Sequence, residues 1–71
     1  MYLKRIRELR VTRAYTQKQV ASYLHISQST YSEYENGHIN VPIETLIQLS
    51  KFYHVSLDYI TELTDVMESE K

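Results

Sequence analysis

The chain has 71 residues and no cysteine, which leaves room for one small domain and excludes disulfides and thiolate metal sites. We find no signal peptide and no apolar run near membrane-spanning length, so we expect a cytoplasmic protein without a membrane partner. A formal net charge of −1 looks wrong for a nucleic-acid binder unless the charge is unevenly distributed, while one Gly and one Pro favour an all-α fold with short loops.

Residues 1–14 are predicted to form the first helix, because Leu3, Ile6 and Leu9 recur at three-residue intervals. The basic residues gather in and just after this segment, where only Glu8 opposes them: Lys4, Arg5, Arg7, Arg10, Arg13 and Lys18. From Asp58 onward, acidic residues dominate instead. This asymmetry can present a basic face to DNA, although scattered solvated charge is the alternative interpretation.

Two short helices are predicted next, and each has a clear start. Thr16 and Gln19 form a capping-box pattern, and Ser27 can cap the second of these helices. Residues 24–26 form the turn between them, and Gly37 suits a left-handed cap at the far end. Two helices joined by so short a turn match the helix-turn-helix unit, whose second helix enters a DNA major groove.

The second of these helices has two distinct faces. Tyr31 and Tyr34, three residues apart, can face inward with Leu24 and Ile26, and small Ala21 allows the two helices to approach closely. Four polar side chains are then left outside: Gln28, Ser29, Ser32 and Glu33. Such donors and acceptors are what reading base edges needs. An ordinary solvated face is the alternative.

Pro42 suits the first turn of a further helix that extends from about residue 43 to 54. Its apolar stripe is Ile43, Leu46, Ile47, Leu49 and Phe52. Ser56 can then cap a last helix whose stripe runs through Leu57, Ile60, Leu63 and Val66 or Met67. This excess apolar length indicates either a dimer face or the completion of the monomer's core. We expect one domain at residues 1–67 and an acidic tail at 68–71.

From Leu9 to Ile60 the chain resembles the Cro and phage-repressor type of helix-turn-helix protein, also called the xenobiotic-response-element family. The matching stretches are LRVTRAYTQKQVASYL, ISQSTYSEYENG and VPIETLIQLSKFYHVSLDYI. The resemblance implies a compact five-helix lambda-repressor-like fold, with the helix-turn-helix at helices two and three. It also implies a bacterial or phage transcriptional regulator, in particular a repressor, that binds double-stranded DNA as a homodimer. Its palindromic operator would have half-sites roughly 34 Å apart.

The resemblance also implies roles for particular residues. Gln28, Ser29 and Glu33 would read bases, with Gln28 pairing to adenine and Glu33 accepting from a cytosine amino group. The residues expected at the DNA backbone are Gln17, Lys18, Ser27, Thr30, Ser32, Asn36 and Asn40. Arg10 and Glu35 would form a structural ion pair. A dimer interface would use Leu57, Ile60, Leu63 and Met67.

Three positions depart from the family pattern. His25 occupies a turn position where glycine is common. The loop at residues 38–41 lacks the Lys or Arg that often contacts phosphate there. Tyr31 and Tyr34 replace aliphatic residues, so one hydroxyl must reach a partner or the surface.

Other classes of function find less support. The chain has no nucleophile elbow, no glycine-rich phosphate loop and no paired carboxylates, so we expect no enzymatic activity. Its three histidines match no compact zinc motif, and we expect no metal, cofactor or small-molecule ligand. The rival hypothesis is an antitoxin-like or anti-regulator protein whose main role is to bind a protein partner.

Overall fold

In the computed structural model, which describes residues 2–63 and 67, the chain forms five helices. They are α1 (Lys4–Thr12), α2 (Gln17–Leu24), α3 (Gln28–Asn36), α4 (Ile43–Tyr53) and α5 (Leu57–Ile60). The described residues contain no strand, and the predicted all-α, five-helix fold is confirmed. None of the helices within this part of the chain is long and apolar enough to cross a membrane.

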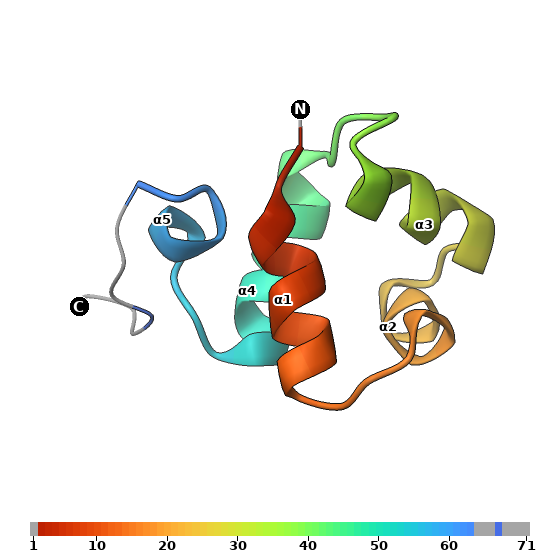
Figure 1. Cartoon of the computed structure of the whole chain (residues 1–71), viewed down its shortest axis with the longest axis horizontal. Helices are drawn as coiled ribbons and strands as arrows, with labels where there is room; N and C mark the ends of the chain where they lie inside the picture. The colour runs from red at the N-terminus through yellow and green to blue at the C-terminus, as the bar shows by residue number, and fades with distance from the viewer. Residues whose placement is uncertain (1, 64–66, 68–71) are drawn as a thin grey trace.

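Figure 1 shows α1 and α4 in the middle of the molecule, with α5 on one side and the α2–α3 pair on the other. Each helix sends at least one side chain into a shared core. Side chains with no exposed surface come from all five helices, namely Ile6, Val20, Tyr31, Leu49 and Ile60. No helix here is long enough to be stable alone, so this common core holds the fold together.

The predicted hydroxyl caps of α2, α3 and α5 are confirmed, whereas α1 begins at Lys4 rather than at residue 1. Thr16 Oγ1 accepts from the backbone N–H of Gln19 at 3.0 Å, while the Gln19 side chain accepts from the Thr16 N–H at 2.8 Å. Ser27 and Ser56 accept equivalent bonds from residues three positions later. Each cap satisfies a backbone donor that would otherwise have no partner in the helix.

The first helix is shorter than predicted, because Ala14 adopts a positive φ of 63° and the helix ends at Thr12. The prediction that Ile43 and Ile47 belong to the apolar stripe of α4 is wrong, because their side chains are 56% and 39% exposed. The buried side chains of α4 are Leu46, Leu49 and Tyr53. A helix turns about 100° per residue, so the face that contains these three leaves Ile43 and Ile47 beside it rather than on it.

The last helix differs most from its prediction. It ends at Ile60, and Glu62 has a φ of 67°, so the expected stripe does not continue as helix to Leu63. Ile60 was expected in a dimer interface but is fully buried in the protomer's own core. Leu57 is half-buried against the same core, whereas Leu63 and Met67 are 78% and 44% exposed. Val66 and the acidic tail at 68–71 lie outside the described residues.

Candidate nucleic-acid interface

The contact between α2 and α3 depends on a small residue and a strained turn. Ala21 is 1% exposed, and its small side chain lets the helices pack closely. His25 ends α2 in the left-handed conformation, with φ 59° and ψ 40°, and Ile26 donates to the carbonyl of Ala21 at 3.1 Å. Only His25, Ile26 and Ser27 separate the two helices, so the chain changes direction within a single turn.

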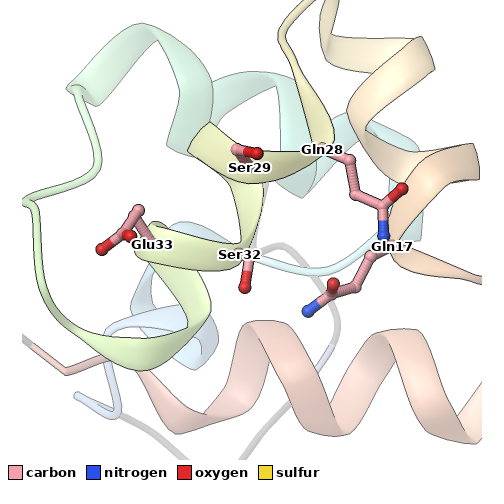
Figure 2. Close-up of a pocket in the computed structure, with 5 residues that line it drawn as sticks. All are labelled: Gln17, Gln28, Ser29, Ser32 and Glu33. Carbon is pink, nitrogen blue, oxygen red and sulfur yellow. The ribbon is translucent and has the colours of Figure 1, made fainter.

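The outer face of α3 borders an open hollow of about 360 Å³. Figure 2 shows the side chains that line it, four from α3 and one from the start of α2: Gln28, Ser29, Ser32, Glu33 and Gln17. The inner face of α3 carries Tyr31 and Tyr34, which are buried as predicted. The outer face therefore offers amide, hydroxyl and carboxylate groups to anything that lies along α3.

The residues expected to read bases all lie on this accessible side. Gln28, Ser29 and Glu33 are exposed, and Ser32 is half-buried beside them. Thr30 is also half-buried, and its hydroxyl accepts from Ser27 Oγ at 2.9 Å. Side chains from two successive turns of one helix thus form a continuous polar surface, which is the arrangement that a helix in a major groove requires.

Two further residues expected at the DNA backbone, Asn36 and Asn40, are exposed near the end of α3. The Asn36 amide donates to the Ser32 hydroxyl at 3.5 Å. At the other end of the face, Lys18 is exposed beside Gln17 in the first turn of α2. Thr16 caps the N–H of Gln19, but the N–H groups of Gln17 and Lys18 have no acceptor within the helix, so this end of α2 suits a phosphate.

A buried ion pair lies directly behind the hollow. Arg10 of α1 donates to the Glu35 carboxylate of α3 through Nε at 2.7 Å and Nη2 at 3.2 Å, and Gln17 donates to the same carboxylate at 3.1 Å. The Glu35 side chain is 1% exposed. Burial alone would raise the pKa of Glu35, but Arg10, the neighbouring Tyr31 and Gln17 together outweigh it and the pKa is lowered. The carboxylate thus stays charged and joins three helices.

Gln17 therefore has a role that sequence reasoning did not find. We expected its side chain at a DNA phosphate, and its amide nitrogen also donates one hydrogen bond to Glu35. A glutamine amide nitrogen has two N–H donors, so one remains available to a phosphate. The backbone N–H groups of α2 and the neighbouring Lys18 lie beside this donor.

The basic residues near the N-terminus do not form one face. Arg5 donates to the carbonyl of Tyr59 at 2.9 Å with its guanidinium over the Tyr59 ring, and Arg13 donates to the carbonyl of Tyr53 at 2.9 Å. Arg10 reaches α3 instead. The charge asymmetry that we interpreted as a DNA-facing surface therefore serves in large part to join α1 to the other helices.

One of the hydroxyls of Tyr31 and Tyr34 was expected to reach a partner or the surface. The Tyr31 hydroxyl is buried without a hydrogen bond, as is that of Tyr53. Burial and the neighbouring Glu35 carboxylate raise the pKa of Tyr31, so its phenol stays neutral. The described residues contain no cluster of three or more His, Asp or Glu side chains that could hold a metal ion.

One residue of this surface was missed at the sequence level. His38 follows the cap of α3, and its Nδ1 lies 2.7 Å from the Glu33 carboxylate. The sequence does indicate this contact, because a glycine cap in the left-handed conformation, here Gly37, brings the next residue back beside the last turn of the helix.

Comparisons with known proteins agree with this geometry. A helix-turn-helix family model matches residues 6–60. The "Uncharacterized HTH-type transcriptional regulator YobD" of Bacillus subtilis is 40% identical over 65 residues, which are 92% of this chain and 58% of that protein. The "HTH-type transcriptional regulator ImmR" of the same organism is 35% identical over 68 residues, or 96% of this chain and 54% of that protein.

A third similar protein comes from a different organism. The "Cryptic phage CTXphi transcriptional repressor RstR" of Vibrio cholerae is 34% identical over 71 residues, which are all of this chain and 64% of that protein. The chain thus spans less than two thirds of the length of each of these three relatives.

Proposed function

We propose, from the premise that this chain belongs to the helix-turn-helix family of the Cro and phage-repressor type, that it is a sequence-specific DNA-binding transcriptional regulator. The observation that carries the proposal is the polar, accessible outer face of α3 beside the first turn of α2. In this proposal α3 lies in the major groove, and the protein acts in the cytoplasm as a repressor. The names of ImmR and RstR, a transcriptional regulator and a transcriptional repressor, support this direction.

The proposed contacts divide into two kinds. Gln28 and Glu33 read base edges, and Ser29 contributes a hydroxyl that suits more than one base. The DNA backbone is contacted by the first turn of α2, including Lys18, and by hydroxyl and amide groups at the edges of α3, namely Ser27, Thr30, Ser32, Asn36 and Asn40. Three of the chain's eight Lys and Arg residues, Arg5, Arg10 and Arg13, bond to the protein itself, which reduces the positive charge available to phosphates. We therefore expect modest affinity.

The protein is further proposed to bind a palindromic operator as a homodimer. α5 lies at the opposite end of the molecule from α2 and α3 in Figure 1. A second copy joined near α5 would therefore leave both α3 helices uncovered. The side chains proposed for this contact are Leu63 and Met67, with Leu57 at its edge. Sedimentation at micromolar concentration tests it, because Leu63→Asp should shift a dimer toward the monomer.

Fluorescence anisotropy with labelled duplexes tests the DNA proposal. Random duplexes should bind weakly, with an affinity that falls as salt rises, and a duplex selected from a random pool should bind more tightly. The absence of salt-sensitive binding at low ionic strength would favour the rival, a protein that uses the same fold mainly to hold a protein partner.

A further inference from the structure

The last turn of α3 brings His38 back against the helix. Gly37 adopts a φ of 76°, and the His38 N–H donates to the carbonyl of Glu33 at 3.0 Å. A Cβ atom at position 37 would lie 3.2 Å from the Cβ of Tyr2, so both the backbone angle and the space favour glycine. The position of His38 is thus set by the backbone.

The imidazole meets the carboxylate of Glu33, one of the residues proposed to read bases. His38 Nδ1 and Glu33 Oε1 are 2.7 Å apart. An ionised carboxylate can only accept, so Nδ1 carries the proton and donates to it. One donor uses a small part of a carboxylate's accepting capacity, and the group can still accept from a base.

This pair adds little to folding stability. The side chains of His38 and Glu33 are 65% and 48% exposed. Ion pairs in such exposed positions are strongly screened by water. The consequence of the contact is therefore the placement of the Glu33 carboxylate, which lines the hollow outside α3.

A glutamate that faces DNA without a hydrogen-bond donor beside its carboxylate has two disadvantages. Its side chain samples several rotamers, and its charge is repelled by the phosphates. A donor at Nδ1 restricts the rotamers and offsets part of the charge. We propose that His38 is a specificity-determining positioning residue, which holds Glu33 so that its carboxylate selects a base with a major-groove amino group, cytosine in particular.

This inference rests on the proposed function, and the two can fail separately. The experiment measures dissociation constants by anisotropy for a selected operator and for all single-base changes of it. The proteins are the wild type, Glu33→Ala, His38→Ala and the double variant. His38→Asn tests rescue, because its amide can also donate to a carboxylate. His54→Asn is the control, since His54 is an exposed histidine outside α3 and its loop.

We expect the wild type to prefer cytosine at one position, and Glu33→Ala to reduce that preference about fivefold or more. His38→Ala should reduce the preference at the same position by about threefold, with no further loss in the double variant. His38→Asn should recover part of it. His54→Asn should leave every preference unchanged.

Three results would overturn the inference but not the proposed function. His38→Ala could lose the same affinity for all duplexes, or it could have the same effect on base preference when Glu33 is already replaced by Ala. The His38→Ala protein could also have a much lower melting temperature than the wild type. The first would indicate a phosphate contact and the last a structural role. A wild type without any base preference would overturn the proposed function as well.

Discussion

Arg10 of α1 and Glu35 of α3 form a bidentate ion pair, with nitrogen–oxygen distances of 2.7 and 3.2 Å. Residues from α1 and α3 are thereby joined, and the same carboxylate also receives Gln17 from α2. Because Glu35 is almost fully buried, the pair fixes the position of α3 relative to the two other helices.

Removing one partner should be costly. Arg10→Met leaves the Glu35 carboxylate buried without its cation, and we expect a loss of about 3–5 kcal/mol in the free energy of unfolding. Arg10→Met/Glu35→Leu removes both charges, so it should lose much less. Urea unfolding followed by circular dichroism checks both. Equal losses in the two variants would show that the charge left behind is unimportant.

Acid should weaken the fold through the same carboxylate. The pKa of Glu35 is lowered below its ordinary value of 4.5, so its contribution to stability is complete above that pH and is lost as the pH falls through the lower folded value. The difference in unfolding free energy between wild type and Glu35→Gln should therefore shrink below about pH 4.5. Glu8→Gln, at an exposed position, is the control. A difference that stays constant down to pH 3 would contradict this assignment.

Two histidines adopt a backbone conformation that suits glycine better. His25 and His54 both have a φ of 59° and are exposed. We expect His25→Gly and His54→Gly each to raise the unfolding free energy by roughly 0.5–1 kcal/mol, because the strain relieved exceeds the added chain entropy. Ser22→Gly, inside α2, should lower it by a similar amount. Thermal unfolding of the three variants gives the comparison. If His25→Gly and His54→Gly lowered the unfolding free energy as much as Ser22→Gly does, the two histidines would not be strained.

Much of the site could be predicted from local sequence. Thr16, Ser27, Ser56 and Gly37 occupy positions where helix ends have strong chemical preferences, and the structure uses each as expected. The inward placement of Tyr31 and Tyr34 follows from helical spacing. These features depend on residues close together in the chain.

Contacts between distant residues could not be predicted in this way. Arg5 and Tyr59 are 54 positions apart, and no periodicity indicates that a guanidinium would bind that carbonyl. The length of α5 was overestimated, because apolar spacing continued past Ile60 while the backbone left the helix near Glu62. Ile60 was assigned to a dimer face, but it is buried because α1 and α4 pack around α5. Local apolar spacing does not indicate this packing.

The most direct test of the account compares two residues at the same surface. Gln28→Ala should relax base preference at a single operator position by about 1–3 kcal/mol, because its amide is proposed to read one base. Lys18→Ala should weaken all duplexes alike and reduce the salt slope by about one, because its ammonium is proposed to meet a phosphate. Lys18 is the better control than Gln17, whose amide supports Glu35. Anisotropy titrations against the full set of single-base variants give this difference, and identical behaviour of the two variants would contradict the placement of α3 in the major groove.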